Sequence, residues 1–424
     1  MGDWSKLPEE LLGLIALRLY SVIELIRFRS ICKSWRSSAS GVNKNHSLSS
    51  PLIYFKPLQI ILARAQANGQ ILSKYHGTVL SRATFFRVTL ASSPDQGWLI
   101  KSDTDLKYRN FHLLNCLSRK ALGRSRKLIS LSEFIVSEIQ ESYAVVGRRT
   151  RETASEFKRV FLVRVQGGDH RVLVIGIDGK IRFWKGGIWN GIKKQVAQFS
   201  DFVLDEGLTY AVDTKGIMWW ISSAYDIIRY GTKLHENITN GSCGEKRFVR
   251  CRGELYIVDR LIDENLLKRK ADSYDDNAIV HFRNADYTNA DLWEDGNGND
   301  DFFAAQAAQA HRFIHVLHDN LGNVSCKPFE RDPPKTIGFK VYKNDEELLK
   351  WVEVKSLGDK AIVIATDACF SVSAHEFYGC LPNSIYFTDK KEEEIKVFKL
   401  DDGSITTMSE SEQSCFQMFV PSFL

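Results

Sequence analysis

One short phrase recurs along this chain and restricts its fold more than any other feature. It is a run rich in β-branched and aromatic residues that ends in an aspartate, and it occurs at 208–213 (LTYAVD), 254–259 (ELYIVD) and 384–389 (SIYFTD). The terminal aspartates stand 46 and 130 residues apart, and the second spacing is close to three units of about 43 residues. A four-stranded propeller blade occupies about 40 to 50 residues. The spacing therefore favours a β-propeller over a β-sandwich.

The sequence around these phrases has the same character. Short runs rich in Val, Ile, Phe, Tyr and Trp are separated by Asp, Asn and Gly turns, and the pair Asp178-Gly179 between two such runs is a strong hairpin signal. Residues 51–424 have room for six or seven blades, and closure into a ring would cover the strand edges. We predict a large all-β domain over residues 81–424, a six- or seven-bladed β-propeller.

Residues 262–310 depart from this strand rhythm. The acidic run 291–301 has the composition of a mobile loop, and residues 304–310 are rich enough in alanine and glutamine for one or two helical turns. We predict an acidic insertion between two blades, at the rim of the propeller. The composition favours a spacer, and contact with a partner is the alternative.

The first 41 residues differ, because their apolar residues recur at helical spacing. Leu7-Pro8 followed by Glu9-Glu10 predicts a helix start, since proline is tolerated in the first turn and carboxylates suit the positive end of the helix dipole. Leu14 and Leu17 lie on the far side of this helix. Its broad apolar face is formed by Leu11, Leu12, Ile15, Ala16 and Leu19.

Two further helices are predicted before residue 41. Ser21 to Glu24 has the spacing of a capping box, and a third short helix carries Ile31, Cys32 and Trp35 before serines 37, 38 and 40 and Gly41 end it. A unit of about 40 residues is too small to bury so much apolar surface alone. We expect part of this surface to be covered by a second protein.

Composition bounds the cellular setting. A chain of 424 residues fits a small module plus one large domain. No run approaches the about 20 apolar residues of a transmembrane helix, and no signal-type segment opens the chain. Its eight cysteines have no paired short spacings, which argues for reduced thiols. We expect an intracellular protein, nuclear, cytoplasmic or both, without membrane contact.

Motifs for catalysis, metal binding and nucleic-acid binding are weak. The chain lacks a Gly-x-Ser-x-Gly elbow, a phosphate-binding Gly-Lys-Ser/Thr loop and a His-Glu-x-x-His helix. His311, His315 and His318 could bind zinc from one helix face, but their apolar neighbours and the turn at 319–323 favour a strand and hairpin, where they would not converge. Residues 107–164 are basic but carry no nucleic-acid-binding motif. We expect no enzyme activity, cofactor, metal or nucleic acid.

Several of these residues also carry a resemblance. Leu7-Pro8, the run Glu10-Leu11-Leu12 with Ile15 and Leu19, and the segment 31–36 (ICKSWR) resemble the F-box, the adaptor-binding module of SCF-type cullin-RING ubiquitin ligases. The phrases at 97–101, 350–359 and 383–389 resemble the plant F-box proteins whose C-terminal β-propeller is of long-unassigned function, in particular the Skp-interacting-partner type. Cys116 stands where that family usually has proline, which affects only a turn.

The resemblance implies a division of labour along the chain. Residues 1–41 would be a three-helix F-box, 42–80 a linker with a leading strand, and 81–424 the propeller with its insertion at 262–310. The F-box would bind a Skp-type adaptor and through it a cullin, and the propeller would bind a protein substrate, as a non-catalytic receptor subunit. By position, the adaptor-binding residues would be Leu7, Pro8, Leu11, Ile15, Leu19, Ile31 and Trp35. The alternatives are a propeller binding protein outside any ligase and a propeller hydrolase or lyase.

Overall fold

The protein is described here from a computed structural model. Two compact units are present, Met1–Ile262 with Thr336–Leu424, and Asp263–Lys335, and each is described by itself. The structure describes residues 7–18, 22–45, 78–103, 112–122, 133–147, 153–154, 156–164, 170–185, 188–192, 195–205, 207–231, 245–263, 314–318, 324–328, 335–345, 350–389, 394–408 and 413–421.

Three helices open the first unit, as the sequence predicts. They are α1 (Glu9–Arg18), α2 (Val22–Ile31) and α3 (Lys33–Asn45). The carbonyl of Pro8 accepts the amide of Leu12 at 3.1 Å, so the proline stands at the start of α1, where its missing N–H costs nothing. The prediction that residues 37–41 end the third helix is wrong. Ser37 and Ser38 donate their hydroxyls back to the carbonyl of Ser34, and the helix continues through them.

The first eight strands form one sheet made of two four-stranded groups. The first group has the order β3-β2-β1-β4 and the second the order β5-β6-β7-β8. In the described strands, one residue pair, Tyr143 with Val160, joins β4 to β5. The strands are β1 (Thr78–Leu90), β2 (Ser93–Asp103), β3 (His112–Leu114), β4 (Phe134–Gly147), β5 (Phe157–Arg164), β6 (His170–Gly176), β7 (Ile181–Lys185) and β8 (Ile188–Gly191).

Three further sheets follow in this unit. Their orders are β12-β11-β10-β9, β13-β14-β17-β18 and β20-β19-β21-β22-β23. The strands are β9 (Phe199–Asp205), β10 (Leu208–Asp213), β11 (Met218–Ile221), β12 (Ile227–Arg229), β13 (Glu245–Cys251), β14 (Glu254–Ile262), β17 (Thr336–Asp345), β18 (Lys350–Val354), β19 (Lys360–Ile364), β20 (Cys369–Ser373), β21 (Ser384–Phe387), β22 (Lys396–Lys399) and β23 (Ile405–Thr407). Two short 3-10 helices, η6 (Ala374–Glu376) and η7 (Gln413–Phe419), are also described in this unit. The three recurring phrases correspond to β10, β14 and β21.

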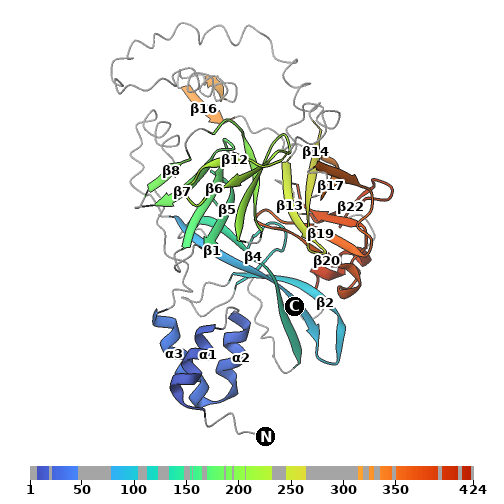
Figure 1. Ribbon diagram of the computed structural model, residues 1–424. Coiled ribbons are helices and arrows are strands. Elements are labelled where there is room, and N and C mark those ends of the chain that lie inside the picture. Colours follow the sequence, from blue (N-terminus) through green and yellow to red (C-terminus); the bar gives the residue numbers. More distant parts are fainter. Residues whose placement is uncertain are drawn as a thin grey trace. The chain divides into compact units, whose positions relative to one another are not determined.

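Figure 1 shows the strands of these five groups. Apolar cores join each group to the next. The last core places the C-terminal sheet against β1 and β2, so the groups close into a ring, and the predicted propeller architecture is confirmed. Pairs of buried residues that mark the five cores, in chain order, are Leu80 and Val172, Ile175 and Phe199, Tyr210 and Phe248, Val258 and Ile385, and Phe85 and Val363. We call strands β1–β14 and β17–β23 the propeller.

The described residues give five strand groups where the repeat spacing predicted six or seven blades. Two features use up the chain length. Strands β1 and β4 contain 13 and 14 residues, more than twice the typical strand of about 5 to 6. In addition, the stretch Asp263–Lys335 forms the second compact unit, whose described strands, β15 and β16, pair with each other in a sheet of their own.

The second unit is inserted within one sheet. Strands β14 and β17 flank it in sequence and pair directly, with Ile257 opposite Tyr342. The predicted position between two blades is therefore wrong. The unit contains β15 (Ile314–His318) and β16 (Val324–Pro328), which pair antiparallel. His315 and His318 thus lie on a strand, as the sequence indicated, while His311, the acidic run 291–301 and the leading strand predicted within 42–80 lie outside the described residues.

One glycine provides a test of the packing against η7. Gly379 has a φ of +63°, and a Cβ there would collide with the carbonyl oxygen of Ser414. Gly403 has a similar φ of +70° but nothing within 4 Å of its Cβ position. We expect Gly379→Ala to lower the free energy of unfolding by about 1 to 3 kcal/mol more than Gly403→Ala, because only the first adds overpacking to backbone strain. Urea unfolding followed by tryptophan fluorescence measures the difference. Equal losses would show that the η7 segment yields to the new methyl group.

Candidate functional site

Helix α1 carries two apolar stripes with different surroundings. Leu12 and Ala16 are fully buried in a small core with Phe28 of α2 and Ala39 of α3. The second stripe consists of Leu11, Leu14 and Ile15, whose exposed fractions are 47%, 54% and 37%. We call these three residues the apolar face of α1.

The geometry of the helix explains the division. At about 100° per residue, Leu11 and Ile15 lie about 40° apart on the helix, and so do Leu12 and Ala16, but the second pair is turned by 100° from the first. Among the described side chains, the second pair packs against Phe28 of α2 and Ala39 of α3. Three adjacent large apolar side chains that stay in water are typical of a surface that binds a partner. Among the described residues of α2, Ile31 is a further exposed apolar side chain, with an exposed fraction of 56%.

The residues that the resemblance marked fall into three groups. Pro8, Leu11, Ile15 and Ile31 are exposed. Leu7 and Trp35 are half-buried and pack against the helical core, with the Trp35 ring 4.5 Å from that of Phe28. Leu19 lies outside the described residues. The exposed residues are therefore accessible to a partner, whereas Leu7 and Trp35 pack on the helical core and can support the exposed surface.

Leu14 was not among those candidates. Helical spacing had placed it on the far side of the helix from a single broad face containing both Leu11 and Leu12. In the structure Leu14 instead extends the exposed stripe. The signal that could have found it is its angular distance from Leu11, about 60° when measured around the helix.

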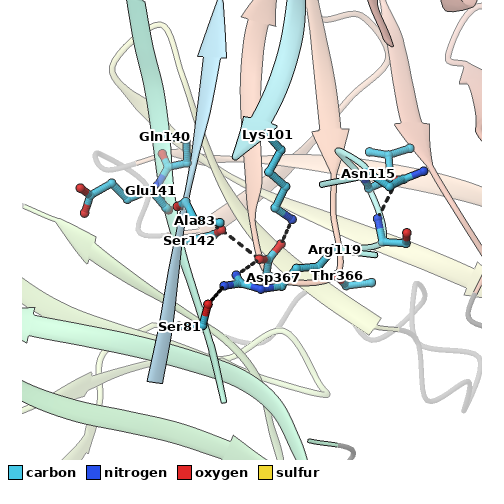
Figure 2. Close-up of polar contacts among 12 residues, drawn as sticks. Ser81, Ala83, Lys101, Asn115, Arg119, Gln140, Glu141, Ser142, Thr366 and Asp367 are labelled. Carbon is cyan, nitrogen blue, oxygen red and sulfur yellow. Dashed lines mark hydrogen bonds and ion pairs between the residues drawn. The ribbon is translucent and has the colours of Figure 1, made fainter. Parts of the chain in front are cut away.

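A second cluster of polar side chains is buried inside the propeller. Asp367, in the turn between β19 and β20, has a side chain only 5% exposed. It accepts hydrogen bonds from Lys101 Nζ at 2.6 Å, Arg119 Nη1 at 2.5 Å and Ser142 Oγ at 2.9 Å. Arg119 also donates to Ser81 Oγ at 2.7 Å. Figure 2 shows these side chains converging on Asp367.

The charges in this cluster are strongly coupled. Burial favours a raised pKa for Asp367, but the Lys101 and Arg119 cations outweigh it and hold that pKa well below its ordinary value. Burial also lowers the pKa of Lys101, against the attraction of Asp367. Both carboxylate oxygens are engaged, so the cluster acts as a structural connection between the C-terminal sheet and strands β1, β2 and β4. Sequence reasoning did not single out any of these residues.

Two other properties bear on function. In the part of the chain that the structure describes, no group of three His, Cys, Asp or Glu side chains is arranged to hold a metal ion. Among the described helices, none has the length and apolar character needed to cross a membrane.

Comparison with protein families agrees with this architecture. The family described as KIB1-4 beta-propeller matches residues 73–399, and the F-box domain matches residues 4–47. The chain belongs to the F-box proteins that carry a KIB1-4 β-propeller. The resemblance drawn from the sequence is thereby confirmed.

Individual relatives of this chain are F-box proteins of a plant. The chain is 99% identical to F-box protein At2g17690 of Arabidopsis thaliana over 424 residues, which is all of both chains. It is 46% identical to probable F-box protein At1g65740 of the same plant, again over the whole of both chains. It is 25% identical to F-box protein SKIP23 of Arabidopsis thaliana over 91% of this chain and 84% of that protein.

Proposed function

We propose that this protein is the substrate-receptor subunit of an SCF-type ubiquitin ligase. The F-box helices bind a Skp-type adaptor, and through it a cullin, while the propeller binds a protein substrate. The observation that carries the proposal is the apolar face of α1, three large side chains that the other F-box helices leave in water. Pro8 and Ile31 extend the proposed contact, and Leu7, Leu19 and Trp35 contribute to it directly or as supports.

The energetics of the apolar face fit a binding role. Fully burying a leucine or isoleucine side chain stabilises by about 1.5 to 3 kcal/mol, so covering three half-exposed ones supplies about 2 to 4 kcal/mol. That is a factor of about 30 to 1000 in affinity from one stripe of one helix. A surface of this strength fits the centre of an interface, where a few residues carry most of the binding free energy.

The proposed role is geometric, and the protein itself carries out no chemistry. Holding a substrate beside the ubiquitin-charged enzyme raises the effective concentration of its lysines, and other subunits form the isopeptide bond. Cysteines 32, 116, 251, 369, 380 and 415 are free thiols, which fits action in the nucleus, the cytoplasm or both.

Introducing charged side chains into the apolar face of α1 tests the adaptor contact. In the full-length chain, Leu11→Asp combined with Ile15→Asp places two carboxylates on the apolar face. We expect binding to a purified Skp-type adaptor to weaken by more than about 100-fold, because both charges would be buried unpaired in the interface. Isothermal titration calorimetry measures the dissociation constants.

The matched control is Ile228→Asp, which changes an equally exposed apolar side chain on β12 of the propeller. It should bind the adaptor like the unmodified chain. The proposal fails if the double variant binds as tightly as that control, or if the unmodified chain does not bind the adaptor at all.

A further inference from the structure

Three arginines of the propeller surround one carboxylate. Arg247 Nη2 lies 2.8 Å from Glu245 Oε1, and Arg159 Nη2 lies 4.0 Å from the same oxygen. Arg260 Nη1 lies 3.7 Å from Oε2. These residues come from β5, β13 and β14, so two separate strand groups build the cluster. We call Arg159, Arg247 and Arg260 the arginine cluster.

The arginine cluster contains more positive than negative charge. Besides Glu245, Arg159 has Asp201, whose Oδ1 is 3.1 Å from its Nε. Arg260 also binds Asp389, but the other oxygen of Asp389 accepts Lys396 Nζ at 2.7 Å. Within the described residues, four cations, Arg159, Arg247, Arg260 and Lys396, therefore share three carboxylates, Asp201, Glu245 and Asp389. An excess buried charge of this kind is costly unless a further anion balances it.

The arginine cluster also has hydrogen-bond donors to spare. Arg159 and Arg247 have side chains only 5% and 6% exposed. Nε and Nη2 of Arg159, and Nε and Nη1 of Arg247, make no hydrogen bond with any described residue, although Arg159 Nε is close to Asp201. Buried donors normally find partners, since each one left unbonded costs about 1 to 3 kcal/mol.

Glu245 is more exposed than the three arginines that surround it. Its side chain is 26% exposed, whereas the three arginines are 5% to 10% exposed. Glu245 is also the first residue of β13, so its side chain is at the end of a strand and not in its middle. The place of one glutamate carboxylate corresponds in size to a single compact anionic group and not to an extended polyanion.

We propose that Arg159, Arg247 and Arg260 form a binding site for one phosphate-type oxyanion, and that Glu245 occupies this site until the ligand displaces it. Planar guanidinium forks match the oxygens of a phosphate, which presents more acceptors than a carboxylate and carries up to one more negative charge. Displacement of Glu245 into solvent exchanges one anionic charge for nearly two, which removes the excess charge of the cluster and supplies acceptors for its unbonded donors.

The test uses the full-length chain and inorganic phosphate. The midpoint of thermal unfolding is measured against phosphate concentration, with sodium chloride added to hold the ionic strength constant. We expect the midpoint to rise with the logarithm of phosphate concentration, as it does for a ligand that binds only the folded state. Arg247→Gln should weaken the apparent phosphate affinity by more than about tenfold, since it removes one charged fork.

Glu245→Gln gives the sharper result, because all three arginines remain. Without phosphate, in sodium chloride alone, removing the competing carboxylate should lower the midpoint of thermal unfolding. It should also tighten apparent phosphate binding about tenfold, if Glu245 fills the site nine-tenths of the time. Arg252→Gln is the control, since Arg252 is an exposed arginine paired with Asp359 at the β13–β14 turn. It should leave the phosphate response unchanged.

The source of the phosphate is distinguished by a further arm. A phosphoserine peptide that binds more tightly than inorganic phosphate, and more tightly than its serine counterpart, indicates a phosphorylated protein. Equal affinity for the peptide and for inorganic phosphate indicates a small phosphate. The inference is overturned if phosphate has no more effect than chloride, or if Glu245→Gln responds like the unmodified chain. It does not depend on adaptor binding, and the Leu11→Asp, Ile15→Asp variant should respond to phosphate normally.

Discussion

Replacing Asp367 with asparagine is expected to lower the free energy of unfolding by about 3 to 5 kcal/mol, the usual cost of removing one partner from a buried ion pair. Lys101 is fully buried and Arg119 is 3% exposed, so both cations lose the carboxylate that balances them. Urea unfolding followed by tryptophan fluorescence measures the loss. Asp359→Asn is the matched control, because Asp359 is 48% exposed and pairs with Arg252 at the surface; its effect should be small, as is usual for surface ion pairs.

The same variant should change how stability depends on pH. The pKa of Asp367 is lower in the folded protein than its ordinary value, because the Lys101 and Arg119 charges outweigh its burial. A depressed carboxyl pKa contributes stability above the pKa of the unfolded chain, about 4, and that contribution is lost as the pH falls toward the folded value. The difference in the free energy of unfolding between the unmodified chain and Asp367→Asn should therefore be largest at pH 7 and shrink below about pH 4. If this difference in the free energy of unfolding is constant from pH 7 to pH 3, the aspartate acts through packing and not through its charge.

Leu12→Ala is expected to unfold the F-box helices, whereas Leu11→Ala leaves them folded. Leu12 is fully buried between α1, α2 and α3, and truncating a buried leucine costs about 2 to 5 kcal/mol. A helical unit of this size has little stability to lose. Leu11 is 47% exposed, so its truncation should cost far less. Hydrogen exchange read by mass spectrometry on peptides that cover residues 7–18 measures the protection of α1.

This pair of neighbours also separates folding from binding. Both variants should bind a Skp-type adaptor less tightly, but only Leu12→Ala should lose amide protection in α1. Equal protection in the two variants would mean that the core around Phe28 does not hold α1 in place.

Strand identity was readable from the sequence because its signals are local. The phrases at β10, β14 and β21 are rich in β-branched and aromatic residues, as strands are, and the Asp178-Gly179 turn is where the sequence placed it. Gly179 has a φ of +72°, and Asp178 accepts the Lys180 amide at 3.1 Å. Such a hairpin depends on the residues of the turn itself and not on contacts with distant parts of the chain.

The division of the α1 surface was only partly predictable. Helical spacing identifies apolar stripes, but it cannot say which stripe the other helices will cover. Leu12 rather than Leu11 is buried because Phe28 and Ala39, from two other helices, lie on its side. The orientation of one helix on another is a tertiary property, so a single broad face was predicted where the structure has two.

The buried ion pairs could not be predicted for a related reason. Lys101 and Asp367 are 266 residues apart in sequence, and no local pattern links them. The position of the insertion is a similar case, since β14 and β17 pair across the whole of Asp263–Lys335. Contacts made across such separations follow from the closed topology, which spacing between repeats indicates only in outline.

The seam of the ring, where the C-terminal sheet meets β1 and β2, has a consequence for synthesis on the ribosome. Phe85 and Leu99 have their apolar partners, and Lys101 and Arg119 their counter-charge, in β19–β23 and the adjoining turns. A nascent chain that has emerged only as far as β18 contains four strand groups. The apolar and positively charged edge that β19–β23 will cover is still exposed to solvent. Exposed apolar surface of this kind favours aggregation or chaperone binding, so the time taken to translate β19–β23, residues 360–407, sets how long this edge stays uncovered.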